Sequence, residues 1–401
     1  MGKSFIARQP ICKRGGEVAG YRLLCQDSEL AESAFKDGDV SQAKALVNSF
    51  VDVALDKVAG QNRAFVPVTR DFLLSPFAES LPKKRVVLEI PANTLVDQPL
   101  VDAVARLSKK GYWIALDGFV DVDQTKPLAE FTKLAKLDVR ASDWDAVVTQ
   151  FLALKKLGLN LVARNVDTRE EYEFSARLGF DLYEGSFFCK PDPTLHKQIP
   201  FNRLSTIYLL TKLQDPDISA RELEHAVGQD VAITYRVLRY LNSPAHAFPK
   251  KIESIRHAVA LVGTSLLSNW ASAALLGSIE NKPRELMVTG IVRAHVCQQL
   301  GAAMNQKNTA QFFTVGLLSV VDALLDRPLR DALLLLPVAD AIKDALLHHE
   351  GLMGEALSCI KSYERGDWSN TRCGTLSEKT IGDAYLSSLM LARSITQEIA
   401  A

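Results

Sequence analysis

The sequence lacks an excess of charge of either sign, because 47 lysines and arginines balance 47 aspartates and glutamates in 401 residues. A chain without net charge has no overall attraction to nucleic acid or to an anionic membrane, so we expect neither as a partner. Cysteine is also sparse, and none of the six forms a C-x-x-C pair. Their spacing excludes a zinc knuckle or a thioredoxin-type site and favours a reducing, cytoplasmic location.

Long apolar runs are rare as well. The first residues, MGKSFIARQP, have no apolar core of the kind that a signal peptide needs. One uncharged stretch, 258–279, is long enough to cross a bilayer, but serine, threonine and asparagine recur through it. Gly263, followed by Thr264 and Ser265, indicates a helix end and a new helix cap. We therefore expect two short buried helices there instead of a membrane span.

What is present changes in character near residue 190. Before it, short β-rich runs alternate with helical runs, which predicts a parallel sheet with crossover helices. The expected strands are 5–8, 64–68, 86–90, 112–116, 134–137, 160–163 and 181–183. The main helical runs between them are 40–59, 98–109, 143–157 and 168–178. About seven such units favour an α/β fold, a TIM-like (β/α) barrel, over an open doubly wound sheet.

The second half of the chain is almost free of strand patterns and predicts an all-α helical bundle. Its apolar-periodic runs are 203–213, 219–227, 230–241, 254–262, 265–277, 285–304, 309–325, 329–335, 338–347, 352–363 and 378–398.

The stretch between the halves is rich in proline, with Pro191, Pro193 and Pro200. Such a density is typical of a stiff, extended linker. The expected domains are a barrel over 1–191, a proline-rich linker over 192–200 and a helical domain over 201–401.

Polar side chains stand at the carboxyl-terminal ends of the expected strands, the face on which (β/α) barrels carry their chemistry. They are Glu89, Asp117, Lys136, Asp138, Arg164, Asn165 and Glu184. Several acids with one lysine suit divalent metal and phosphate chemistry. The alternative is that these charges mark only where strands reach the surface, and spacing alone gives this plainer interpretation the greater weight.

The first half resembles an EAL domain, the barrel of cyclic-di-GMP phosphodiesterases. The segments that carry the resemblance are RQPI (8–11), GEVAGYRLLCQ (16–26), LEI (88–90), IALDGF (114–119), KLD (136–138), LVARNVDT (161–168) and LGFDLYEGSFFCKP (178–191). Their order and spacing are more specific than any one motif, and together they span essentially all of 1–191. The resemblance implies a barrel whose members hydrolyse cyclic-di-GMP with divalent metal ions.

The chain departs from this family at the positions where the resemblance places metal and phosphate. Arg22 and Arg164 stand where the family has metal-binding glutamates, and Gln26 replaces an arginine that contacts phosphate. Further departures are Ala92 for an acid, Gly118 for an aspartate and Glu184 for a glutamine. The kept positions are Glu89, Asp117, Lys136 and Asp138.

Divalent cations need several converging carboxylates, and an arginine beside a metal position repels the metal. Glu89, Asp117 and Asp138 are instead expected to pair with Arg22 and Arg164 and to close the mouth of the barrel. We therefore predict no metal site, no cofactor and no phosphodiester hydrolysis by the mechanism of the family.

The second half resembles an HDOD domain over about 201–395, in the form that is joined to an EAL barrel. The matching segments include Asp230, LRYLNSP (238–244), the turn at 261–263, Trp270, FFTVGLLSVVDALLDRPL (312–329) and SYERGDW (362–368). The order of the two domains is itself the strongest evidence for the resemblance. It implies a helical domain that is similar to HD phosphohydrolases but lacks their metal ligands.

The histidines agree with that implication. His295 could be the first ligand of an HD site, but the expected His-Asp pair is Ser319 and Val320. One imidazole cannot hold a catalytic metal, so we expect His295 to be a core or helix-surface residue. His348 and His349 lie on another predicted helix and are expected to be solvated.

Two other residues receive a structural interpretation. Asn242 is expected to end a helix and begin a turn together with Ser243 and Pro244, and Trp270 to be a buried anchor.

The leading hypothesis is a non-catalytic bacterial signalling protein, linked by resemblance to cyclic-di-GMP and to motility, biofilm or stress. It would act through contacts with signalling proteins that the sequence does not identify. One alternative is a metal-free cyclic-di-GMP receptor that uses Gln9, Arg22 and Arg164. Another is a weak metal-dependent phosphodiesterase, for which the candidates are Glu89, Asp117, Lys136 and Asp138. A homodimer is also open, because EAL barrels often form one.

Overall fold

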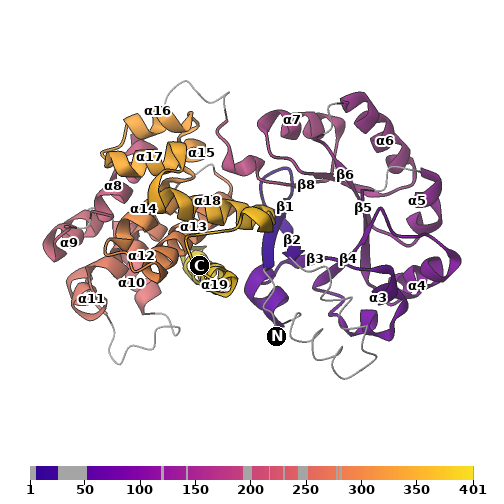
Figure 1. The fold of residues 1–401 in the computed structure, drawn as a ribbon, viewed down its shortest axis with the longest axis horizontal. Helices are drawn as coiled ribbons and strands as arrows, with labels where there is room; N and C mark the ends of the chain where they lie inside the picture. The colour runs from indigo at the N-terminus through magenta and orange to yellow at the C-terminus, as the bar shows by residue number, and fades with distance from the viewer. Residues whose placement is uncertain are drawn as a thin grey trace. The chain divides into compact units, whose positions relative to one another are not determined.

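The computed structural model describes residues 6–25, 52–118, 122–140, 143–192, 201–215, 217–228, 231–242, 252–276, 279 and 282–400. The chain divides into two compact units (Figure 1). The first comprises Met1–Phe188 with Glu364–Gly366, and the second comprises Cys189–Tyr363 with Asp367–Ala401. Of the predicted linker 192–200, only Asp192 is among the described residues, so its boundaries stay a prediction.

The first unit is a closed eight-stranded barrel in which the strands follow one another in chain order (Figure 1). They are β1 (Ile6–Cys12), β2 (Val18–Cys25), β3 (Arg63–Pro67), β4 (Val86–Pro91), β5 (Trp113–Asp117), β6 (Leu134–Asp138), β7 (Asn160–Arg164) and β8 (Leu182–Glu184). Neighbouring strands from β2 to β8 are parallel, whereas β1 is antiparallel to both β2 and β8. The predicted (β/α) barrel is confirmed.

The prediction of seven strands in an all-parallel sheet was wrong in one region. It missed β2, and β1 runs against its neighbours because a short turn joins it directly to β2. In that turn the N–H of Lys13 donates to the carbonyl of Glu17 at 2.8 Å. Two strands joined by a tight turn must be antiparallel, because a parallel pair needs a long crossover. A glycine and an arginine, Gly20 and Arg22, interrupt the apolar pattern of β2.

Helices surround the strands (Figure 1). They are η1 (Asp52–Ala59), α3 (Arg70–Leu74), η2 (Pro76–Ser80), α4 (Gln98–Lys109), α5 (Val122–Ala129), α6 (Trp144–Lys156), α7 (Arg169–Leu178) and η3 (Phe187–Cys189). The predicted runs 98–109, 143–157 and 168–178 agree with α4, α6 and α7 to within a residue. Each of these helices begins at a side-chain cap, and Thr168 forms a capping box with Glu171. Of the predicted run 40–59, residues 40–51 lie outside the described residues, and residues 52–59 are helical.

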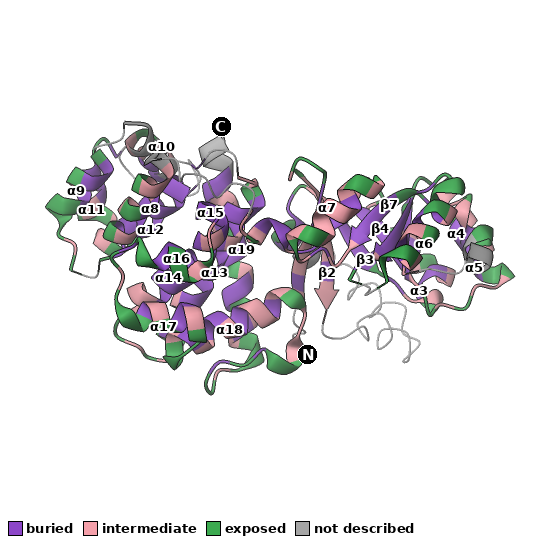
Figure 2. Cartoon of the chain, turned by 90° about the horizontal axis from the view of Figure 1, so that it is seen from above, coloured by how far each residue is buried: buried purple, intermediate pink, exposed green. Residues whose placement is uncertain are grey.

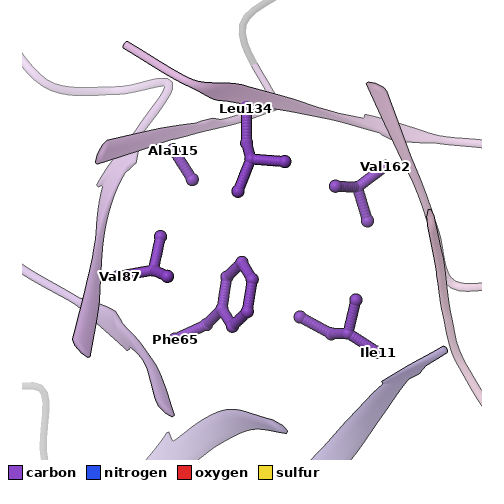
Figure 3. Close-up of a cluster of buried hydrophobic side chains, with 6 residues drawn as sticks. All are labelled: Ile11, Phe65, Val87, Ala115, Leu134 and Val162. Carbon is purple, nitrogen blue, oxygen red and sulfur yellow. The ribbon is translucent and has the colours of Figure 1, made fainter. Parts of the chain in front are cut away.

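A layer of apolar side chains fills the interior of the barrel (Figure 3). It consists of Ile11, Phe65, Val87, Ala115, Leu134 and Val162, with Leu182 packed against it. The Phe65 ring takes the space beside Gly20, where an added Cβ would lie 2.6 Å from the ring. This layer closes the barrel beneath the carboxyl-terminal ends of the parallel strands, which we call the mouth.

The second unit is helical, and the described residues after Glu184 contain no strand. Its elements are α8 (Phe201–Leu213), α9 (Ala220–Gly228), α10 (Val231–Leu241), α11 (Ile255–Val262), α12 (Thr264–Leu276), α13 (Arg284–Ala303), α14 (Thr309–Leu318), α15 (Val321–Leu325), α16 (Leu329–Leu334), α17 (Asp340–His348), α18 (Gly351–Arg365), η5 (Trp368–Asn370) and α19 (Glu378–Ala400). The all-α prediction is confirmed. The apolar-periodic run 309–325 contains two helices, α14 and α15, which are separated by Ser319 and Val320.

The uncharged stretch after residue 258 forms two helices, as expected. α11 ends at Gly263, whose φ of +82° is a conformation that favours glycine, and α12 begins at the next residue. Every residue from Leu267 to Leu276 is buried, which explains the apolar run (Figure 2). None of the helices described by the structure is long and apolar enough to cross a membrane.

We predict that Phe65→Ala lowers the free energy of unfolding of the barrel by about 3–5 kcal/mol, because it empties the centre of the apolar layer. Leu95→Ala is the control, since Leu95 is 67% exposed and its truncation should change stability by less than about 0.5 kcal/mol. Urea unfolding followed by tryptophan fluorescence measures both. Equal losses in the two variants would contradict the assigned role of the layer.

Candidate functional site

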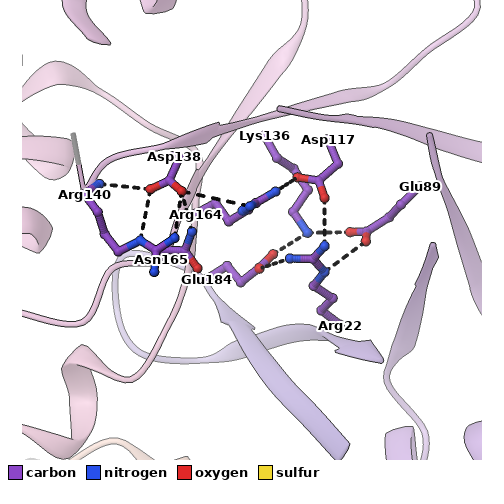
Figure 4. Close-up of polar contacts among 9 residues, drawn as sticks. All are labelled: Arg22, Glu89, Asp117, Lys136, Asp138, Arg140, Arg164, Asn165 and Glu184. Carbon is purple, nitrogen blue, oxygen red and sulfur yellow. Dashed lines mark hydrogen bonds and ion pairs between the residues drawn. The ribbon is translucent and has the colours of Figure 1, made fainter. Parts of the chain in front are cut away.

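A second layer of side chains lies toward the mouth, directly above the apolar one. Side chains alternate along a strand, so the residue two positions beyond a member of the apolar layer also faces the interior. On five strands this residue is charged, and on β2 Arg22 lies two positions beyond Gly20, beside which the Phe65 ring packs. We call these six residues the charged layer (Figure 4): Arg22, Glu89, Asp117, Lys136, Arg164 and Glu184. Gln9 lies opposite Arg22 in the β1–β2 register. The barrel thus brings together the predicted site residues of its interior. Asp138 lies two positions beyond Lys136 on β6, nearer the mouth.

The Arg22 guanidinium occupies the centre of this layer (Figure 4). Its Nη2 donates to Oδ2 of Asp117 at 2.8 Å, and its Nη1 donates to Oε1 of Glu184 at 3.2 Å. Its Nε lies 3.3 Å from Oε2 of Glu89. Burial works to lower the pKa of Arg22, but the three carboxylates outweigh it and raise that pKa above its usual value. One cation therefore neutralises charge from three different strands.

Lys136 lies deeper and is fully buried. Its ammonium pairs with Glu89 and with Glu184, both of which are also fully buried. Burial raises the pKa of Glu89, against the opposing charges of Lys136 and Arg22. A buried lysine needs such partners, because an uncompensated charge in the interior is costly.

The charged layer is electrically balanced, with three cations against three carboxylates. Arg164 supplies the third cation, and its Nη1 lies 2.5 Å from Oδ1 of Asp117. Burial works to raise the pKa of Asp117, but Lys136, Arg22 and Arg164 together lower it. The predicted pairing of Glu89 and Asp117 with Arg22 and Arg164 is confirmed.

The outer rim has its own contacts. Asp138 lies 3.9 Å from Arg164, but its closer partners are Arg140, at 3.0 Å, and Asn165, at 2.7 Å. Burial works to raise the pKa of Asp138, but the hydrogen bonds from Arg140 and Asn165 lower it. Asn165 adopts a left-handed backbone, with φ of 61°, which turns the chain directly after β7. Of the two arginines with which Asp138 was expected to pair, the described contacts include only Arg164, at 3.9 Å.

Two features of the site were missed from the sequence. Glu184 was named as a strand-end residue that replaces a glutamine, but its pairing with both Arg22 and Lys136 was not predicted. Arg140 was not considered, although its spacing of two residues from Asp138 was a local signal for a side-chain pair. Gln26 lies outside the described residues. In the part of the chain that the structure describes, no group of three or more His, Cys, Asp or Glu side chains is placed to hold a metal ion.

In the helical unit, His295 is buried in α13 and 5% exposed. Its ring meets Phe313 edge-on, with 5.1 Å between centroids. Burial lowers its pKa to about 4, so the imidazole is neutral at pH 7. Ser319, at the position of an expected HD ligand, instead accepts from Nη1 of Arg293 at 3.3 Å. His295 is thus a core residue, as predicted.

The other helical residues singled out also have structural surroundings. His348 and His349 are exposed, and Trp270 is buried, as expected. The Asn242 amide donates to the carbonyls of Leu238 and Ile252 at 2.7 and 2.8 Å and accepts from the N–H of Ile252 at 2.7 Å. This side chain therefore ties the end of α10 to the start of the next described segment. Asp230, Ser243 and Pro244 lie outside the described residues.

We predict that Arg22→Met lowers the stability of the barrel by about 3–5 kcal/mol at pH 7, because only Lys136 and Arg164 then remain to offset three carboxylates. The lowered pKa of Asp117 contributes stability above its unfolded value near 3.8, and this is lost as the pH falls through the folded pKa. Without Arg22 that pKa rises, so acid unfolding should begin at higher pH. Urea midpoints and acid titration of tryptophan fluorescence measure both effects.

The matched control is Arg140→Met, which breaks an exposed pair at the same end of the barrel. It should cost no more than about 1 kcal/mol. A loss from Arg22→Met as small as this would show that the interior pairs do not stabilise the barrel.

Because His295 is neutral when folded, the stability of the helical unit should depend on pH in the acid range. Below about pH 6.5 the unfolded chain takes up a proton that the folded chain excludes until about pH 4, so stability falls as the pH falls between these values. The loss reaches about 3 kcal/mol. His295→Leu should remove it, whereas the exposed His348→Leu should not. Urea unfolding of the helical unit at several pH values tests this, and parallel slopes in the native protein and His295→Leu would refute it.

Comparisons with known proteins agree with this architecture. The sequence model of the EAL domain matches residues 67–191, and that of the HDOD domain matches residues 204–325. The chain therefore contains an EAL domain followed by an HDOD domain. Both assignments suggested by the sequence motifs are confirmed.

Two relatives cover both domains. The uncharacterized protein YuxH of Bacillus subtilis (strain 168) is 28% identical over 373 residues, which are 91% of each chain. The cyclic di-GMP phosphodiesterase CdgJ of Vibrio cholerae serotype O1 is 28% identical over 370 residues, or 91% of this chain and 86% of CdgJ. Among solved structures, an EAL domain protein from Listeria monocytogenes EGD-e aligns with 46% of this chain and 87% of its own, at 12% identity and a TM-score of 0.38.

Proposed function

We propose that this chain is a non-catalytic bacterial signalling protein that acts through protein–protein contacts in a pathway linked to cyclic-di-GMP. Its EAL and HDOD domains and its relative CdgJ, named a cyclic di-GMP phosphodiesterase, support the link to this nucleotide. The observation that supports the loss of catalysis is the pairing of Arg22 with Glu89, Asp117 and Glu184.

The metal ions that an EAL domain implies do not fit the residues present at the mouth. The carboxylates that could act as ligands are already neutralised by Arg22, Lys136 and Arg164. A divalent cation at the same place would meet a guanidinium group within van der Waals reach, and no spare negative charge would offset it. A protein that does not hydrolyse the nucleotide has to transmit its signal by binding other molecules.

Two alternatives share this site. Arg164 is partly exposed, so its guanidinium could bind a phosphate with Gln9 and Arg22 in a metal-free receptor. The name of CdgJ favours testing a weak metal-dependent phosphodiesterase as well. The receptor would have to break ion pairs of Arg22 or Arg164 with Asp117, which costs binding energy.

The deciding experiment titrates the full-length protein with cyclic-di-GMP, with and without Mg²⁺ or Mn²⁺, by calorimetry and by following the nucleotide. We expect neither turnover nor heat of metal binding above that of a buffer control. The same should hold for Glu89→Ala, because an inactive site has no activity to lose.

Each alternative has its own signature. Turnover that Glu89→Ala abolishes would overturn the proposal in favour of an enzyme. Tight binding without turnover, weakened by Arg164→Met and unaffected by Arg140→Met, would establish the receptor. The exposed Arg140 controls for a general loss of positive charge at the rim.

A further inference from the structure

One buried carboxylate in the helical unit contacts both sides of the stretch between the domains. Oδ1 of Asp326 accepts a hydrogen bond from the backbone N–H of Asp192 at 2.9 Å. Oδ2 of Asp326 accepts from Nη1 of Arg203, on α8, at 3.1 Å. In the chain, residues 193–200 lie between these two partners. Asp192 and Arg203 are therefore both held within about 3 Å of the same side chain.

A third group among the described residues joins this cluster. The ammonium of Lys282, just before α13, lies 2.5 Å from Oδ1 of Asp326. The side chains of Arg203, Lys282 and Asp326 are 11%, 8% and 3% exposed. Arg203 also donates to the carbonyl of Leu324 at 3.2 Å. Charge-assisted hydrogen bonds with so little access to water are among the stronger interactions in a protein.

The backbone of Asp326 has a conformation that most side chains disfavour. The residue ends α15 in the left-handed conformation, with φ of 54° and ψ of 43°. Glycine adopts this conformation without strain, whereas other residues adopt it at a cost. An aspartate at this position keeps the cost but supplies the carboxylate that Asp192, Arg203 and Lys282 share.

We infer that Asp326 is a hinge clamp, which fastens both ends of the stretch 193–200 to the helical domain and places the pivot toward the barrel before Asp192. While the clamp is closed, the residues between Asp192 and Arg203 do not add to the length of the connection between the barrel and the helical domain. The clamp gathers groups from α8, from the residues just before α13 and from the cap of α15. Binding at the helical domain that shifts one of these helices would release the hinge. The clamp does not depend on whether the barrel hydrolyses a nucleotide.

The first test compares Asp326→Gly with His349→Gly in the full-length protein. Both substitutions place glycine at a helix end with a left-handed backbone, but only the first removes the carboxylate of the clamp. Hydrogen exchange at the Asp192 amide, read by NMR with labelled aspartate, should be about ten- to a hundredfold faster in Asp326→Gly. It should be unchanged in His349→Gly. Unchanged exchange in a folded Asp326→Gly protein would overturn the clamp.

The second test places two extra glycines in the chain, either between Lys190 and Pro191 or between Thr194 and Leu195. The interdomain distance is followed by energy transfer between one label on α6 and one on α17. In the native background only the first insertion should broaden the distance distribution. In Arg203→Met, which releases only the downstream end, the second insertion should broaden it too.

This second test does not need the Asp326→Gly variant, so it can still decide the question if that variant does not fold. Equal broadening by both insertions in the native background would show that the stretch 193–200 acts as a free spacer, and would refute the clamp.

Discussion

A guanidinium group held by three carboxylates determines the character of the barrel mouth. Glu89 and Glu184 are fully buried, so each needs a cation within contact distance, and Arg22 with Lys136 provides it. The dependence is mutual, because removing either cation leaves two cations for three carboxylates in a medium that solvates charge poorly. The charged layer therefore behaves as one unit. A single substitution at its centre affects strands that are far apart in the sequence.

The helical unit deals with buried polar groups in two other ways. His295 avoids charge altogether, because burial keeps its imidazole neutral. Asp326 keeps its charge and is surrounded by Arg203 and Lys282. In each case the group has a structural explanation within its own domain.

The elements that could be predicted from the sequence are those with local signals. α4, α6 and α7 carry their own caps and amphipathic patterns, so their bounds were found to within a residue. β2 was missed because its inward positions, Gly20 and Arg22, are chosen by the neighbouring Phe65 ring and by distant carboxylates. Local propensity contains no information of that kind.

The same limit applies to the site. Strand ends identified which residues face the mouth, but barrel geometry decides which of them meet. Asp138 therefore binds Arg140 and Asn165 more closely than Arg164. The contact between Asp192 and Asp326 spans 134 positions of the chain and had no sequence signal at all.

The antiparallel course of β1 has a practical consequence. Ile6 pairs with Cys25, so the first residue of β1 stands beside the last residue of β2, at the mouth. The parallel strands begin at the opposite end of the barrel. A tag, reporter or sensor domain fused directly ahead of β1 would thus be delivered to the charged face, whereas the same fusion in an all-parallel barrel would arrive at the far side.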